Sequence, residues 1–191
     1  MAKVFWKPGT LLCPVPVVLV TCGTMENHNA VTVAWTGIVN SDPAMTYISL
    51  RPTRFSHEII SKTGEFAINL VSAGMLRKVD SCGVYTGRKV NKLKSFSLTP
   101  EKGQLIAAPV LKESPLSLEC RVTEVKHLGS HDLFLAEIVS VDVEDRFIDE
   151  NGKLDLRKAD LVAYSHGDYL QLGKKLGSFG FSVKKKHSPK G

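Results

Sequence analysis

Cationic and hydroxyl-bearing side chains gather in the segment "SLRPTRFSHEII" (residues 49–60), where an apolar run gives way to a short helical pattern. They are Arg51, Thr53, Arg54, Ser56 and His57. The start of a helix offers unpaired backbone N–H groups and the positive end of the helix dipole, where phosphate binds readily. Arginine and hydroxyl groups would add further hydrogen bonds to the same anion. From the spacing alone, an anion site and an ordinary capped helix start in solvent both remain open.

A second unusual segment, "NAVTVAWTGIVNSDPAM" (residues 29–45), places small and flat residues on a strand that then turns sharply. Backbone amides around Thr36 and Gly37 could bond the edge of a planar heterocycle, while the small side chain of Ala34 leaves room for its face. The alternative interpretation is a core strand that contains one buried tryptophan, Trp35.

The elements that must position these segments are mostly strands, judged from alternation and turn residues. Strands are predicted at residues 15–22, 30–36, 45–50, 65–71, 116–128, 133–143 and 161–165, and helices at 54–62 and 72–83. Residues 84–114 are expected to be irregular, and the glycine-punctuated segment 169–183 is expected to wrap the outside. Long hairpins without strand–helix alternation predict a mainly β fold, an antiparallel barrel with flanking helices. No G-x-G-x-x-G motif follows the first strand, so a Rossmann domain has no support.

Composition and charge are those of an ordinary globular protein. The chain has 191 residues, 43% hydrophobic and 23% charged, and a net charge of +6. All six excess charges follow Asp168, so the basic character belongs to the C-terminal end and not to a folded face for nucleic acid. We expect one domain over residues 1–183 and a flexible basic tail at 184–191. The chain lacks an apolar run long enough to span a bilayer, and its N-terminus lacks a secretion signal, which predicts a cytoplasmic location without membrane association.

Cysteines, histidines and carboxylates show no motif for metal binding or covalent catalysis. No C-x-x-C pair or G-x-S-x-G motif occurs, and the histidines are scattered. We therefore expect no metal site and four buried, inert thiols, at Cys13, Cys22, Cys82 and Cys120. His127 and His131 straddle a turn, which favours a surface role for both.

The combined segments "PVPVVLVTC", "VTVAWTGIVNSDPAMTYISLRPTRFSHEII" and "GEFAINL" resemble the flavin reductase-like family of FMN-binding split barrels. The later "YTGRKVNKL" looks like the family's segment after its second helix, and "AYSHGDYLQLGKKLGSFGFSV" is similar to the flavoredoxin branch. The resemblance runs over nearly the whole chain. It implies a split β-barrel of Greek-key type, with FMN held non-covalently near a homodimer interface.

The resemblance also implies roles for particular residues. The strand and turn that contact the isoalloxazine ring match Val33, Ala34, Trp35 and Thr36. The family's phosphate and ribityl segment matches Ser49, Leu50, Arg51, Arg54, Phe55, Ser56 and His57. The resemblance therefore implies that the anion bound by residues 49–60 is the FMN phosphate. Lys92 falls where many members carry Asp-Lys-Phe, although this chain has Asn91-Lys92-Leu93, and Ala34 replaces a serine that many relatives have. His166 lies where members bring a histidine or tyrosine to the flavin or nicotinamide, and it is the candidate catalytic residue.

Three functions follow from this resemblance. The first is an NAD(P)H:flavin reductase that passes hydride from nicotinamide to FMN N5 and then passes electrons to an acceptor. The second is a flavoredoxin-type electron-transfer flavoprotein, which a redox protein partner would reduce. The third is an FMN-binding protein without turnover.

Overall fold

The strand β2 (Val18–Gly23) is buried along its whole length because both of its faces are covered. Val18, Val20 and Cys22 point into one apolar core, while Leu19 packs into a second core on the opposite face. The alternation of side chains along a strand sends successive residues to opposite faces. A mostly apolar run is therefore what this position requires, and the sequence "VLVTCG" supplies it, with the buried Thr21 hydroxyl donating to the Pro109 carbonyl oxygen.

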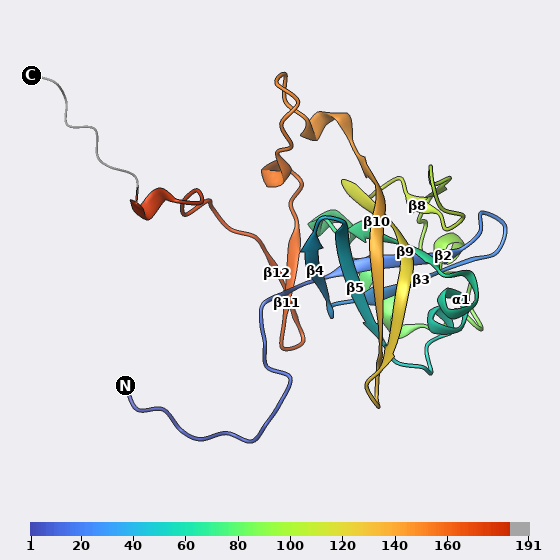
Figure 1. Cartoon of the computed structure of the whole chain (residues 1–191), viewed down its shortest axis with the longest axis horizontal. Helices are drawn as coiled ribbons and strands as arrows, with labels where there is room; N and C mark the ends of the chain where they lie inside the picture. The colour runs from blue at the N-terminus through green and yellow to red at the C-terminus, as the bar shows by residue number, and fades with distance from the viewer. Residues whose placement is uncertain (184–191) are drawn as a thin grey trace, which may run out of the picture.

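The computed structural model describes residues 1–183, and the basic tail expected at 184–191 lies outside the described residues. The centre of the described chain is a curled antiparallel sheet of seven strands (Figure 1). Their order across the sheet is β3 (His28–Val33), β2, β6 (Glu65–Leu70), β9 (Leu116–His127), β10 (Asp132–Val143), β5 (Ala44–Leu50) and β4 (Thr36–Ser41). The β9–β10 hairpin lies between β5 and β6, which are consecutive strands in the chain. This is the split-barrel fold of Greek-key type that the sequence predicted.

Helices close the barrel and cover its outside. The helix α1 (Phe55–Thr63) connects β5 to β6 and buries Ile60 in the barrel core beside Phe66 and Phe134. It ends at Gly64, whose φ of 70° lies in the left-handed region that glycine adopts without steric cost. The helices α2 (Leu76–Val84) and α3 (Lys92–Ser95) cover the second core, on the outer face of β2 and β3.

Smaller elements complete the fold. A second sheet joins β1 (Val15–Pro16), β11 (Val162–Ser165) and β12 (Asp168–Gln171), and a third joins β7 (Pro100–Glu101) to β8 (Val110–Leu111). The short 3-10 helices are η1 (Ala73–Met75), η2 (Asp145–Phe147), η3 (Leu156–Lys158) and η4 (Phe181–Val183).

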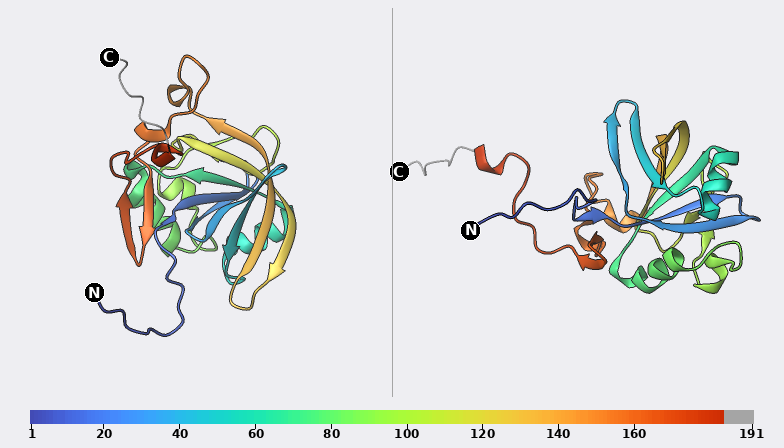
Figure 2. Two further views of the ribbon diagram at one scale, coloured as in Figure 1. Left: turned by 60° about the vertical axis from the view of Figure 1, so that its left-hand side comes forward. Right: turned by 90° about the horizontal axis from the view of Figure 1, so that it is seen from below.

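Four local expectations are corrected by the structure. The strand expected at 30–36 is two strands, β3 and β4, because the chain turns at Ala34 and Trp35. The helix expected from Ser72 begins as the 3-10 turn η1, and α2 starts only at Leu76. The interval 84–114 contains the short helix α3. Residues 172–183 do not wrap the barrel, because they leave it on the same side as the N-terminal segment (Figure 2).

Candidate functional site

A polar hollow of about 280 Å³ lies at the start of α1, where β3 and the segment after α2 meet it. We call it the first hollow. Its cationic side chains are Arg51, Arg54 and Lys92, and it has hydroxyl groups from Thr53, Ser56 and Thr86. Asn29, Val31, Phe55, Tyr85 and Gly87 complete its lining. Cations, hydroxyls and a helix end on one concave surface are the groups that hold a phosphate.

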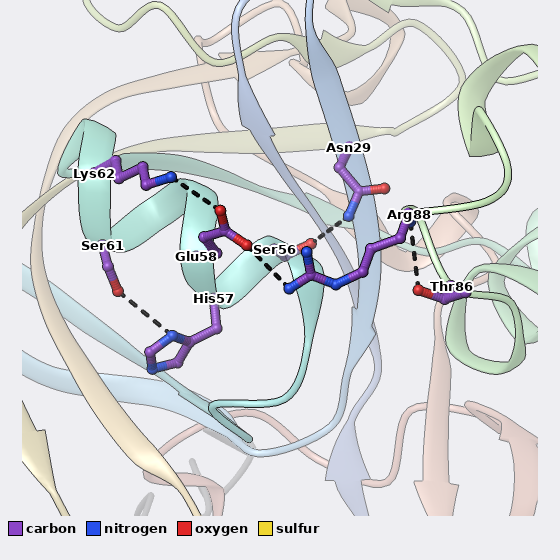
Figure 3. Close-up of polar contacts among 8 residues, drawn as sticks. All are labelled: Asn29, Ser56, His57, Glu58, Ser61, Lys62, Thr86 and Arg88. Carbon is purple, nitrogen blue, oxygen red and sulfur yellow. Dashed lines mark hydrogen bonds and ion pairs between the residues drawn. The ribbon is translucent and has the colours of Figure 1, made fainter.

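The helix start itself faces this hollow. Arg54 is the N-cap residue of α1, with φ of −74° and ψ of 135°, and its side chain makes no capping hydrogen bond. Its guanidinium instead donates to the carbonyl oxygen of Gly83 at 3.2 Å, which links α1 to the end of α2. Ser56 is buried and accepts a hydrogen bond from the Asn29 amide at 2.8 Å (Figure 3). No side chain within residues 1–183 caps this helix start, and the His57 amide donates to the Arg54 carbonyl oxygen at 3.0 Å. The amides of Phe55 and Ser56 are therefore the ones placed to meet an anion.

Lys92 reaches the first hollow from the short helix α3 and is 4% exposed. Its ammonium donates to the carbonyl oxygens of Ala30 at 2.8 Å and Cys82 at 2.7 Å. Burial lowers the pKa of Lys92, and the nearby positive charge of Arg54 acts in the same direction. Two of the three N–H groups of the Lys92 ammonium thus join β3 to α2, and the third remains for a ligand.

A second hollow, of about 170 Å³, runs from the start of α1 to Trp35 and shares Val31, Arg51 and Arg54 with the first. Its further lining residues are Thr32, Val33, Ala34, Trp35, Ser49, Leu50 and His131. The Trp35 backbone is fixed here because its carbonyl oxygen accepts a hydrogen bond from the Ser49 amide at 2.9 Å. Trp35 is 41% exposed, so the alternative of a buried core tryptophan is wrong.

His131 faces Trp35, with 4.6 Å between ring centroids and 36° between ring planes. Burial lowers the pKa of His131, and the positive charge of Arg51 lowers it further. The adjacent Asp132 fixes this part of the β9–β10 hairpin, since its carboxylate pairs with His57 of α1 at 2.7 Å and with His127 at 2.9 Å. His131 is therefore half-buried and lines the second hollow, whereas its companion His127 is exposed, as expected for a surface residue.

A third hollow, of about 500 Å³, lies on the far side of Trp35 and is lined by His166 of the β11–β12 turn. His166 has φ of 50°, and its Nε2 lies 3.0 Å from the thiol sulfur of Cys13. Tyr164 and the N-terminal residues Thr10 and Leu12 complete this end. A fourth, mostly apolar hollow of about 370 Å³ joins it to the second and is lined by Thr36, Tyr47 and Leu133 among others.

The predicted residues fall into three groups. The first and second hollows bring together Val33, Ala34, Trp35, Ser49, Leu50, Arg51, Arg54, Phe55, Ser56 and Lys92. Thr36 lines the fourth hollow and donates to the Tyr47 carbonyl, and His166 lies in the third hollow with Trp35. His57 lines none of them, because its ring turns to Asp132 and packs edge-on against Phe134.

Several lining residues escaped the sequence analysis. The segment "YTGRKVNKL" was noted for its resemblance, but Tyr85, Thr86 and Gly87 were not named as site residues, and neither was Asn29. They lie far along the chain from the α1 residues that they face, so no periodicity within one segment brings them together. The thiol of Cys13 is exposed, so the expectation of four buried thiols holds only for the other three. Burial raises the pKa of Cys22 and Cys82 to about 11 and that of Cys120 to about 12, which keeps those thiols protonated near neutral pH.

The fold and the hollows together define a class of protein. A split antiparallel barrel with a cationic, hydroxyl-lined end and a flat aromatic end suits a ligand that combines a phosphate with a planar ring. No helix within residues 1–183 has the length and apolar character to cross a membrane.

Comparison with known proteins agrees with this class. The family model for the flavin reductase like domain matches residues 10–173, so the chain belongs to the flavin reductase-like family.

The flavoredoxin of Desulfovibrio vulgaris (Miyazaki F) superposes with a TM-score of 0.88 at 28% identity, over 96% of this chain and 100% of that chain. Flavoredoxin from Methanosarcina acetivorans gives 0.86 at 28% identity, with coverage of 96% and 100%. An NADH-dependent FMN reductase from Streptomyces nodosus subsp. asukaensis is 31% identical over 127 residues, 66% of this chain and 68% of that protein. The predicted resemblance, including the flavoredoxin branch, is confirmed, and the family supports a flavin oxidoreductase role.

Proposed function

We propose that this protein binds FMN non-covalently and acts as an NAD(P)H:flavin oxidoreductase. The observation that carries the proposal is that Arg51 and Arg54 line both the first and the second hollow. One ligand with an anionic end and a planar end would therefore span the two hollows, with its charge beside these arginines. FMN has this shape, and relatives in the same family include an NADH-dependent FMN reductase.

The phosphate end would lie in the first hollow. Arg51 and Arg54 would neutralise its charge, and the uncapped amides of α1 with the hydroxyls of Thr53 and Ser56 would complete the donor set. Hydrogen bonds to a charged group contribute about 1.5–3 kcal/mol each, so a few such contacts suffice for a firmly held cofactor. Lys92 adds a third cation from α3.

The planar end would lie along residues 33–36, near Trp35 and His131. When bound, FMN supplies the redox chemistry: it accepts a hydride, with its two electrons, from the nicotinamide and passes these electrons on. The protein's part is to orient the two rings and to exclude water from between them. The apolar fourth hollow and the third hollow beyond Trp35 offer space for the second ring.

His166 would orient the nicotinamide or another substrate from the third hollow. It is the only predicted residue there besides Trp35, and its ring is already held by the contact with Cys13 within the described chain. The hydride step needs no general acid, so His166 serves for binding and orientation.

The experiment is an anaerobic absorbance titration of the purified protein. We expect a yellow protein, or one that becomes yellow with added FMN, whose flavin band bleaches when NADH or NADPH is added. A protein that takes up no FMN would overturn the proposal. Bound FMN that neither nicotinamide reduces would overturn the reductase and leave flavin binding.

The second candidate is a flavoredoxin-type electron carrier, which the two flavoredoxin neighbours favour. A carrier would hold FMN through the redox cycle and accept electrons from a redox protein partner instead of a nicotinamide. Bleaching by a protein reductant such as a reduced ferredoxin, without bleaching by NADH or NADPH, would identify it. FMN that neither reductant reduces would instead favour the third candidate, binding without turnover.

A homodimer also belongs to the proposal. Residues 1–14 and 172–183 extend away from the barrel, and the first of these segments lines the third hollow (Figure 1). Phe5, Trp6, Phe179 and Phe181 on these segments are exposed. Exposed aromatic side chains on extended segments support an interface with a second copy of the chain.

A further inference from the structure

One wall of the first hollow is formed by Tyr85, Thr86 and Gly87, which together with the next residue, Arg88, we call the clasp. Tyr85, Thr86 and Gly87 line the first hollow and not the second, so they stand at the end away from Trp35. If the proposed phosphate lies in this hollow, the clasp is the next surface beyond it. A group attached to that phosphate and directed away from the flavin ring would meet the clasp.

On one side the clasp abuts β3. A methyl group built on Gly87 would come within 2.2 Å of the Asn29 side-chain oxygen, so the backbone of the clasp touches that side chain with no space between them. Asn29 is buried and is fixed in turn by its hydrogen bond to Ser56 of α1. The wall therefore has no gap at this point.

On the other side the clasp is tied to α1 through Arg88. Its guanidinium donates to the Glu58 carboxylate at 2.9 Å (Figure 3). The same group lies 4.9 Å from the centre of the Phe55 ring. Within the clasp, the Arg88 amide lies 3.4 Å from the Thr86 hydroxyl oxygen, to which it donates. Phe55 itself lines the first hollow. Arg88 thus crosses from the clasp to the first turn of α1 and closes the wall from outside.

We propose that the clasp makes this site selective for a terminal phosphomonoester, and therefore for FMN over FAD, with Arg88 and Glu58 as the specificity-determining pair. FAD differs from FMN by an adenylate joined to the same phosphate, and an adenylate directed away from the ring would collide with the clasp. The inference rests on the proposed function, since it assumes that a flavin phosphate lies in the first hollow.

The Arg88–Glu58 pair is suited to this local role. The two side chains are 53% and 41% exposed, and ion pairs of that kind contribute little to global stability. Their effect is to hold one loop against one helix. Glu58 also pairs with Lys62 at 2.9 Å, one turn further along α1, where no part of the first hollow lies. Lys62 therefore provides a matched control on the same carboxylate.

The test compares dissociation constants for FMN, FAD and riboflavin by quenching of flavin fluorescence. We expect the unmodified protein to prefer FMN to FAD by about tenfold or more, and Arg88→Ala and Glu58→Gln to reduce this ratio by about fivefold or more. Arg88→Lys should restore part of the preference, because lysine keeps the charge but loses the planar contact with Phe55. Lys62→Ala should leave the ratio unchanged, and circular dichroism should show that each variant is folded.

The outcomes separate the two proposals. An unmodified protein that binds none of the three flavins would remove the proposed function. If the unmodified protein binds FMN and FAD with equal affinity, the clasp proposal is overturned and FMN binding is left intact. The same holds if the FMN:FAD affinity ratio of the variants stays within about twofold of the unmodified protein's ratio. An equal change in Lys62→Ala would also overturn it, because the effect would then come from the charge of α1 and not from the clasp.

Discussion

Arg51 and Arg54 are both exposed, and each takes part in two hollows, while neither forms an ion pair among residues 1–183. Exposed arginines usually contribute through solvation or surface pairs. Two unpaired guanidinium groups beside an uncapped helix start are instead placed to bind an anion. At the scale of single residues, this pair determines where the proposed phosphate lies.

Replacement of both arginines tests this placement. We expect Arg51→Ala with Arg54→Ala to weaken FMN binding by about 3 kcal/mol or more, because two charged hydrogen-bond donors are lost. Riboflavin lacks the phosphate, so its affinity should change little. Isothermal titration with both ligands measures the difference, and equal losses for FMN and riboflavin would contradict a phosphate role.

At the scale of elements, two neighbouring carboxylates, buried Glu119 and half-buried Asp142, lie where a loop meets the base of the β9–β10 hairpin. The Glu119 carboxylate is fully buried on β9 and accepts hydrogen bonds from the backbone amides of residues 104–106 at 2.6–3.0 Å. Asp142 on β10 has a buried Oδ2 without a hydrogen-bond partner in the described chain. Burial, and then the neighbouring Glu119, raises the pKa of Asp142 to about 6.

This shift predicts a pH dependence of stability. Between pH about 4 and 6, Asp142 keeps its proton in the folded state but loses it in the unfolded state, so the folded state binds more protons. The free energy of unfolding should therefore fall as pH rises through that window, by about 1–2 kcal/mol after allowance for solvent screening. Asp142→Asn should remove this contribution, as urea unfolding of both proteins at pH 4.5 and 7 would show. Identical pH profiles would rule out Asp142 as the source.

Another carboxylate of the β9–β10 hairpin, Asp132, lies next to the candidate site and forms two ion pairs. Asp132 joins α1, through His57, to the end of β9, through His127, and so sets the position of His131 opposite Trp35. The pKa of Asp132 is lowered, first by its hydrogen bond from His127, so the carboxylate is ionised at neutral pH. His57, which the resemblance placed among the phosphate ligands, acts here as a link between elements.

At the scale of the whole molecule, apolar surface remains uncovered on one side of the barrel. Ile38 and Val39 on the edge strand β4 are 68% and 50% exposed, and the extended terminal segments carry exposed aromatic residues. An exposed edge strand with apolar side chains favours association with another chain. These features are the physical support for the proposed homodimer.

The dimer is tested by mass in solution. Light scattering should give twice the chain mass of 20.9 kDa. Phe5→Ser with Trp6→Ser should weaken association by about tenfold or more, because aromatic contacts dominate interface energies. Lys3→Ala with Lys7→Ala is the matched control on the same segment and should leave the mass unchanged. A monomer at all concentrations would contradict the proposal.

Much of the fold was predictable because its causes are local. The strand β2 needs apolar residues on both faces and has them, and α1 ends at a glycine that adopts the left-handed conformation. The long runs of β9 and β10 and the turn between them predicted a hairpin, which forms. The turn at Trp35 was missed because "VAWT" continues a strand-like pattern, and only pairing with β5 divides it into β3 and β4.

The sequence by itself determined most of the strands, the start of α1 and the two arginines of the proposed anion site, since alternation, turn residues and charge are local properties. The tertiary structure alone decided what faces them. The clasp meets α1 across 30 residues through Arg88 and Glu58, His57 turns to Asp132 across 75, and Cys13 meets His166 across 153. Such contacts depend on the order of strands in the sheet, and no periodicity in a single segment encodes that order.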